Sequence, residues 1–169
     1  MILTTPRLTL RRATRQDLKA LHRVFTDVRA MRYWSRPAHA SLDQTRAYLD
    51  LMINAQDADD FVLIHEGRLI GKAGAWKLPE VGFILHSDHW GKGLAQEALT
   101  ALIAHLFAHH DIAALTAEAD PRNTASLGLL AKLGFVETAR AERTLLWGDE
   151  WCDSLYLALF REVWQASGS

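Results

Sequence analysis

Hydrophobic positions along the chain follow two spacings, one typical of helices and the other of strands. Apolar residues recur every three or four positions after Thr14, after Ser41 and along a stripe at 95–106, which predicts three helices. The same spacing at 124–133, closed by Gly134, predicts a fourth helix. Alternating or wholly apolar runs predict strands at 8–11, 61–64, 69–76, 81–85, 114–118, 135–138 and 154–160.

In chain order these segments give a strand, two helices, three strands joined by tight turns, a helix, a strand, a helix and two final strands. The order lacks the repeated strand–helix–strand alternation of a parallel α/β fold. It predicts an α+β fold in which a mixed, mostly antiparallel sheet of about seven strands is flanked by about four helices. No linker or repeat divides the chain, so we expect a single domain over 1–169 with a disordered tail at 166–169.

Composition and charge exclude several classes of protein. Of the 169 residues, 49% are hydrophobic and 23% are charged, which excludes a disordered chain and allows a sizeable core. The formal net charge of -1 lacks the basic excess that binding to nucleic acid usually requires. No apolar run is long enough for a signal peptide or a membrane span, so we expect a cytoplasmic protein that acts away from membranes.

Cysteine and histidine content argues against disulfides and metal binding. The single cysteine, Cys152, excludes an internal disulfide and a Cys-rich zinc site. The eight histidines include no His-Glu-x-x-His pattern, and the pair His109-His110 is expected to form a solvated helix end. We therefore expect no metal.

A glycine-containing loop at 90–98 is the most informative segment for chemistry. It lies between a predicted strand and a predicted helix, where glycines permit a tight turn and free N–H groups of the first helical turn attract an anion. It is not a Walker loop, because Gly93 rather than Ser or Thr follows Lys92. It is not a dinucleotide fingerprint, because Gln96 stands where Gly or Ala is required. By itself the loop is compatible with a phosphate site and with a purely structural turn.

A second motif, at 123–135, contains Asn123 and Ser126 at the start of a predicted helix and ends in Leu133-Gly134-Phe135. Together with the glycine loop and the segment Glu80-Val81-Gly82-Phe83, it resembles the RimJ/RimL-like branch of the GNAT superfamily of N-acetyltransferases. The family pattern [Gln/Arg]-x-x-Gly-x-[Gly/Ala] is matched at Gly93 and Ala95, with Trp90 in place of Gln or Arg. The resemblance covers about the whole chain.

The resemblance implies a GNAT fold and an enzyme that transfers an acetyl group from acetyl-CoA to a primary amine by direct attack on the thioester. It assigns the pantetheine arm to the strand backbone of Phe83, Ile84 and Leu85 and to the Asn123 amide, which could instead cap the helix. The pyrophosphate is assigned to a loop whose members are Gly91, Lys92, Gly93, Leu94, Ala95 and Gln96.

Proton transfer is assigned to two residues. Glu80 is the candidate base, with a solvent-facing turn residue as the alternative. Leu130 stands where many family members carry a catalytic Tyr, so Ser126 is the candidate acid, with a hydroxyl bonded to the helix backbone as the alternative.

The acceptor side is less defined. Tyr33 and Trp34 lie in an Arg- and aromatic-rich loop at 29–37 that we expect to set acceptor specificity, and Asp153 is a further candidate. The acceptor could be a protein N-terminus or a small-molecule amine. A non-catalytic CoA-binding or interaction domain is the alternative function, and a homodimer would cover exposed sheet edges.

Overall fold

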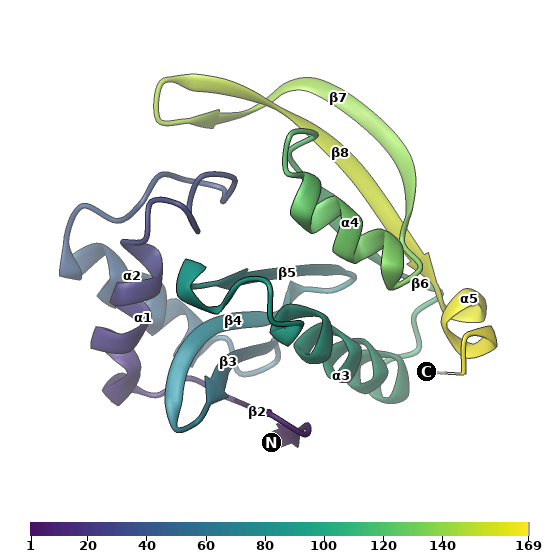
Figure 1. Cartoon of the computed structure of the whole chain (residues 1–169), viewed down its shortest axis with the longest axis horizontal. Coiled ribbons are helices and arrows are strands. Elements are labelled where there is room, and N and C mark those ends of the chain that lie inside the picture. The colour runs from purple at the N-terminus through teal and green to yellow at the C-terminus, as the bar shows by residue number, and fades with distance from the viewer. Residues whose placement is uncertain (169) are drawn as a thin grey trace.

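The computed structural model describes residues 1–168 and has one eight-stranded sheet with strand order β1-β2-β3-β4-β5-β6-β8-β7 (Figure 1). All neighbouring strands pair antiparallel except β5 and β6. The α+β fold with a mixed, mostly antiparallel sheet is thus confirmed. The strands are β1 (Ile2–Thr4), β2 (Leu8–Arg11), β3 (Asp59–His65), β4 (Arg68–Lys77), β5 (Glu80–Leu85), β6 (Ala114–Ala119), β7 (Val136–Trp147) and β8 (Glu150–Phe160).

Helices cover both faces of the sheet (Figure 1). The α-helices are α1 (Leu18–Phe25), α2 (Leu42–Asn54), α3 (Leu94–His109), α4 (Thr124–Lys132) and α5 (Arg161–Ala166), and two short 3-10 helices lie at Arg15–Asp17 and Ser87–His89. None of the helices within residues 1–168 is long and apolar enough to cross a membrane.

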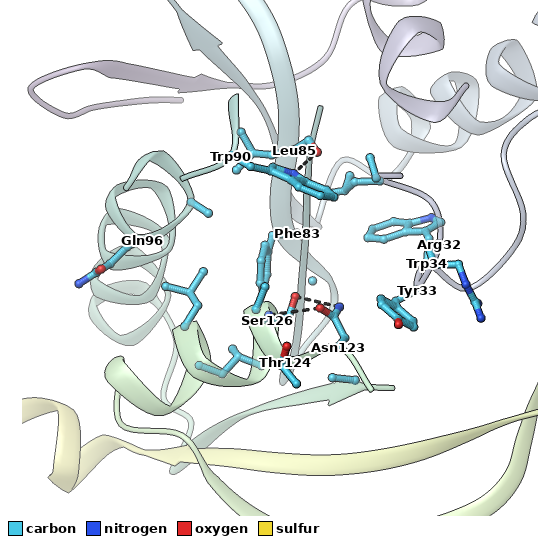
Figure 2. Close-up of a pocket in the computed structure, with 18 of the residues that line it drawn as sticks. Arg32, Tyr33, Trp34, Phe83, Leu85, Trp90, Gln96, Asn123, Thr124 and Ser126 are labelled. Carbon is cyan, nitrogen blue, oxygen red and sulfur yellow. Dashed lines mark hydrogen bonds between the residues drawn. The ribbon is translucent and has the colours of Figure 1, made fainter. Parts of the chain in front are cut away.

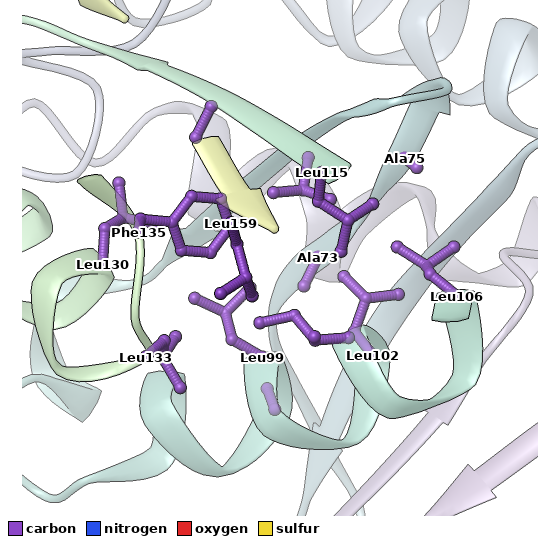
Figure 3. Close-up of a cluster of buried hydrophobic side chains, with 14 of the residues drawn as sticks. Ala73, Ala75, Leu99, Leu102, Leu106, Leu115, Leu130, Leu133, Phe135 and Leu159 are labelled. Atoms are coloured by element: carbon purple, nitrogen blue, oxygen red, sulfur yellow. The ribbon is translucent and has the colours of Figure 1, made fainter. Parts of the chain in front are cut away.

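Alternation along the central strands directs apolar side chains into two cores. Val62 and Ile84 point to the face covered by α1 and α2, where they pack with Phe25 and Leu49. The other face packs against α3, α4 and α5 in a larger core. Figure 3 shows part of this core, including Ala73, Leu99, Leu102, Leu115, Leu130, Leu133, Phe135 and Leu159.

The parallel pair β5 and β6 creates the opening in the sheet. Their register joins only Glu80 with Thr116, and the Thr116 N–H donates to the Pro79 carbonyl at 2.9 Å. Beyond this point the two strands separate, so the backbone edge of β5 toward Leu85 lacks a neighbouring strand on that side. The separation leaves room for a ligand between β5 and β6.

Several elements differ from the sequence expectation. The edge strand β1 was not predicted, because three mostly exposed residues give no usable alternation. The hairpin β7–β8 is much longer than expected. Most residues of β7 are exposed and none is buried, so its sequence lacks the apolar alternation that predicts a strand. The expectation of a disordered tail is wrong at Ala166, which ends α5, while residue 169 lies outside the described residues.

The contacts of the histidines near the end of α3 also differ from the expected solvated helix end. His105 is buried, and its Nε2 lies 3.0 Å from Asp59 Oδ1. His110 is not a merely solvated end, because its Nε2 lies 2.5 Å from Asp59 Oδ2. The long-range partner on β3 explains why a local pattern could not reveal these contacts.

Candidate active site

Two adjoining cavities, each of about 710 Å³, lie where β5 and β6 separate. The first, here called the glycine-loop cavity, is lined by the loop before α3, the outer part of β5 and the start of α4. The second, the carboxylate cavity, is lined by Glu80, Glu118, Asp120 and Asp153 among others. Both cavities share a boundary formed by Arg32, Tyr33, Trp34, Val81, Gly82, Glu118 and Ala119.

The glycine loop has the conformation that its sequence predicts. Gly91 and Gly93 have φ angles of 70° and 74°, in the left-handed region that favours glycine, and Gly93 is the N-cap of α3. The first-turn N–H groups of Leu94, Ala95 and Gln96 have no acceptor within the helix. All three residues line the glycine-loop cavity, whereas Lys92 does not. The Gln96 side chain points away from the cavity, so its contribution is its backbone (Figure 2).

Hydrogen bonds from Thr5 and Arg7 near the start of the chain stabilise the glycine loop on the side away from the cavity. Arg7 donates from Nε to Glu97 Oε2 at 2.7 Å and from Nη1 to the Lys92 carbonyl at 2.8 Å. Thr5 Oγ1 donates to Glu97 Oε1 at 2.6 Å. Although desolvation opposes it, these hydrogen bonds from Thr5 and Arg7 lower the pKa of Glu97, so the carboxylate stays ionised. Glu97 therefore ties the N-terminal segment to the first turn of α3.

The free edge of β5 presents backbone groups to the glycine-loop cavity. The His86 N–H donates to the Ile70 carbonyl at 2.8 Å, and the register pairs Leu85 with Gly71. Alternation then directs the N–H and C=O groups of Ile84 toward β4, and those of Phe83 and Leu85 toward the opening. The Leu85 carbonyl accepts from Trp90 Nε1 at 3.0 Å, as Figure 2 shows.

Asn123 and Ser126 lie together at the start of α4 (Figure 2). Asn123 is the N-cap, and its Oδ1 accepts from the Ser126 N–H at 3.3 Å. Asn123 Nδ2 donates to Ser126 Oγ at 3.0 Å. Because this bond uses an acceptor lone pair of Ser126, the hydroxyl proton of Ser126 is free to be donated into the cavity.

Leu130, where a catalytic Tyr is common in the resembling family, is only 2% exposed and belongs to the core. It lines the glycine-loop cavity but carries no proton to donate. A hydroxyl donor from α4 must therefore come from its first turn.

The carboxylate cavity contains Glu80 at the start of β5 and Glu118 near the end of β6. Partial desolvation and the negative charge of Glu118 raise the pKa of Glu80. Ser154 Oγ donates to Glu118 Oε1. Glu118 could not be predicted as a site residue, because it lies in an alternating strand and belongs to no motif. Only the pairing of β5 with β6 brings it near Glu80.

Asp153 also lines the carboxylate cavity, but part of its side chain is engaged. Its Oδ1 accepts from the Arg143 N–H at 2.9 Å, within an irregular stretch of β7 where Arg143 has a φ of 51°. Asp153 thus stabilises an unfavourable backbone conformation. The second carboxylate oxygen of Asp153 has no hydrogen-bond or ion-pair partner among residues 1–168.

The loop at 29–37 closes the boundary between the cavities. The Tyr33 ring lies near two guanidinium groups, with Arg32 at 5.1 Å and Arg122 at 5.6 Å from its ring centre. Both cations contact Glu150 Oε1, at 3.3 Å and 2.9 Å respectively. Trp147 Nε1 donates to the Met31 carbonyl at 3.3 Å, so the end of the β7–β8 hairpin holds this loop.

A buried lysine forms part of the carboxylate cavity. Lys72 Nζ lies 2.9 Å from Asp60 Oδ1 and 3.0 Å from the Tyr48 hydroxyl. It also lies 5.9 Å from the centre of the Trp34 ring. Desolvation opposes the charge, but Asp60 and Tyr48 raise the pKa of Lys72. Lys72 could not be predicted as a site residue, because a single lysine in an apolar strand carries no motif.

Residues 7–136 match the family described as acetyltransferase (GNAT) domain. The chain belongs to the GNAT acetyltransferase family. It is 30% identical to the uncharacterized N-acetyltransferase p20 of Bacillus licheniformis, over 79% of this chain and 81% of that protein. It is 23% identical to the spermidine N(1)-acetyltransferase of Escherichia coli K12, over 93% of this chain and 88% of that protein.

Solved structures share the fold of this GNAT acetyltransferase. A GNAT-family acetyltransferase from Bacillus anthracis has a TM-score of 0.83 and 25% identity, covering 96% of this chain and 99% of that chain. RimL, a ribosomal L7/L12 alpha-N-protein acetyltransferase in complex with coenzyme A, has a TM-score of 0.82 and 18% identity over 95% and 98% of the two chains. The resemblance to the GNAT superfamily and the assignment to acyltransferases are confirmed, and solved RimL and ribosomal-protein-S5-alanine acetyltransferases share the fold.

The family match makes the chain an acetyltransferase, and its relatives include N-acetyltransferases that act on amines. Solved structures that share this fold hold CoA or acetyl-CoA. The glycine-loop cavity fits an anionic, extended ligand, because it combines free N–H groups of α3 with the free edge of β5. Within residues 1–168 no group of three or more His, Cys, Asp or Glu side chains is placed to hold a metal ion.

Proposed function

We propose that this enzyme acetylates a primary amine that enters through the carboxylate cavity, while acetyl-CoA occupies the glycine-loop cavity. The observation that carries the proposal is the shared boundary of the two cavities, at Val81, Gly82 and Glu118. Donors of hydrogen bonds to an anion lie on one side of it, and acceptors for an ammonium lie on the other. An amine and a thioester can therefore meet there without a covalent intermediate on the protein.

The cosubstrate supplies the acetyl thioester, and the protein orients it. The N–H groups at 91–96 and the helix dipole favour the pyrophosphate. The outward backbone groups of Phe83 and Leu85 pair with the pantetheine amides, whereas Ile84 contributes by packing beneath them. Asn123 holds Ser126 and lines the same cavity, so capping the helix and contacting the ligand are compatible roles for it.

Glu80 is the proposed base. A lysine-like amine of pKa about 10.4 costs about 4.6 kcal/mol to deprotonate at pH 7, so a nearby acceptor for the proton matters. The raised pKa of Glu80 makes its carboxylate more basic than an ordinary glutamate. Glu80 takes up the proton that the amine loses, either directly or through one water molecule.

Ser126 is the proposed acid for the leaving thiolate. Its oxygen accepts from Asn123, which polarises the hydroxyl and keeps its proton available. The family-like position seven residues after Asn123 holds a buried leucine and cannot serve.

The acceptor class that the cavity supports is a cationic amine. The carboxylates of Glu80 and Glu118 lack an ion-pair partner among the described residues, so they attract an ammonium group. Among the relatives, one is a spermidine N(1)-acetyltransferase and another, 34% identical over 91 residues, is a [ribosomal protein uS5]-alanine N-acetyltransferase, both from Escherichia coli K12. A small-molecule amine and a protein N-terminus are therefore both candidate acceptors, and the experiment below includes both.

The test incubates the protein with acetyl-CoA and matched panels of small amines and N-terminal peptides, and follows both free CoA and acetylated product. Acceptor-dependent release of CoA with equal formation of product supports the proposal. Tight CoA binding with no turnover across the panel would instead support the non-catalytic CoA-binding alternative. Glu80→Gln should lower kcat by about 10²-fold or more at unchanged acetyl-CoA affinity, while the exposed Glu162→Gln on α5 serves as a control.

A further inference from the structure

Arg29 lies beside the glycine loop although it belongs to the distant loop at 29–37. Its guanidinium is 5.1 Å from the centre of the Trp90 ring, and both residues line the glycine-loop cavity. No carboxylate among residues 1–168 forms an ion pair with Arg29. The cavity thus has a cation that is held by an aromatic ring and is free to meet an anion.

Asp27 fixes both members of this pair. Its Oδ1 accepts from the Arg29 N–H at 3.1 Å, and its Oδ2 accepts from the Ser87 N–H at 2.7 Å, three residues before Trp90. Desolvation opposes ionisation, but the hydrogen bonds from Ser87 lower the pKa of Asp27, so the Asp27 carboxylate stays ionised. Trp90 is also anchored through Nε1 to the Leu85 carbonyl at 3.0 Å. The stacked pair is therefore held at both ends before any ligand arrives.

The other cations near the glycine loop, Lys92 and Arg7, do not line the glycine-loop cavity. Arg7 lies behind the loop, where Glu97 and the Lys92 carbonyl occupy its Nε and Nη1. Among residues 1–168, Arg29 is therefore the one guanidinium lining the glycine-loop cavity that has neither a carboxylate nor a carbonyl partner.

We propose that the Arg29–Trp90 pair is a second pyrophosphate-binding element, opposite the N–H groups of α3. This inference rests on the proposed use of acetyl-CoA. The planar guanidinium of Arg29 donates to pyrophosphate oxygens, while the indole face of Trp90 holds it in position. Trp90 stands where the family pattern carries Gln or Arg.

The experiment compares acetyl-CoA, its 3′-dephospho form and S-acetylpantetheine, which lacks both the pyrophosphate and the nucleoside. Arg29→Gln should weaken binding of acetyl-CoA and of the dephospho form about tenfold each, since both retain the pyrophosphate. The kcat/KM for S-acetylpantetheine should stay within twofold of wild type. Arg29→Lys should fall between, because it keeps the charge but loses the planar fork. The matched control is Arg36→Gln, an exposed arginine of the same loop that lines neither cavity.

Each outcome has a distinct meaning. An equal loss with all three thioesters, or no loss with any, would overturn the proposal. A loss confined to acetyl-CoA would assign Arg29 to the 3′-phosphate and would likewise overturn it. Failure of the wild-type protein to bind acetyl-CoA would refute the proposed function itself, whereas normal wild-type binding with an unaffected Arg29→Gln variant refutes only this inference.

Discussion

Glu80 and Glu118 line one cavity from two neighbouring strands, and partial desolvation together with the charge of Glu118 raises the pKa of Glu80. Thr116 pairs with Glu80 in the register, which places Glu118 two residues farther along β6. A like charge disfavours ionisation of its neighbour, so Glu118 strengthens Glu80 as a base. It also offers a second acceptor for a cationic substrate.

Glu118→Gln should therefore move the acidic limb of the pH profile to lower pH. Removing the negative charge lowers the pKa of Glu80, so Glu80 stays deprotonated to a lower pH, although it is then a weaker base. The measurement is kcat/KM for the amine as a function of pH at saturating acetyl-CoA. An exposed glutamate outside both cavities, changed by Glu142→Gln, should leave the limb in place. If the acidic limb of Glu118→Gln shifts to higher pH or does not move, Glu80 is not the group whose titration produces this limb.

Ser126→Ala should lower kcat by about 10²-fold while the Kd for CoA changes less than twofold. The reason is that the Ser126 proton is free, whereas Asn123 still caps α4 through the Ser126 N–H. Single-turnover kinetics and equilibrium binding separate the two effects. Thr124→Ala, which removes a neighbouring hydroxyl from the same cavity, is the control. A parallel loss of CoA affinity and turnover would make Ser126 a binding residue rather than an acid.

Lys72→Met should reduce the free energy of unfolding by about 3–5 kcal/mol, because it leaves the buried Asp60 carboxylate without its counter-ion. Adding Asp60→Asn to this variant should recover a large part of the loss, since a buried charge is then removed. Urea denaturation of the two single variants and the double variant gives the coupling energy. Additive losses would show that the two side chains do not stabilise one another.

Asp59→Asn should destabilise the protein by about 2–3 kcal/mol at pH 7, because Asp59 joins β3 to His105 and His110 at the end of α3. Desolvation opposes it, but these histidines lower the pKa of Asp59 below its ordinary 3.8. The stabilisation is therefore complete above pH 3.8 and is lost as the pH falls through the lowered value in the folded state. Urea denaturation at several pH values should show the gap between variant and wild type narrowing in acid. A gap that widens in acid contradicts this assignment.

Local sequence determined much of the framework. The glycines of the loop, the N-cap Ser41 and the Asn123–Ser126 pair could be predicted because each acts on backbone within about one helical turn. Hydrophobic spacing predicted most helices and strands, because alternation and helical period reflect which face is buried. It failed for β7, where both faces are largely exposed and the period disappears.

Most of the order of the elements, the glycine turn before α3 and the cap at the start of α4 follow from local sequence, since these features depend on neighbouring residues. By contrast, three contacts depend on the packing of the whole chain: Glu118 near Glu80, Lys72 beneath Trp34 and Arg29 over Trp90. Each of these relationships joins segments at least 38 residues apart, as the numbers of Lys72 and Trp34 show. Strand pairing and helix packing bring such segments together, and no local spacing encodes which side chains then meet.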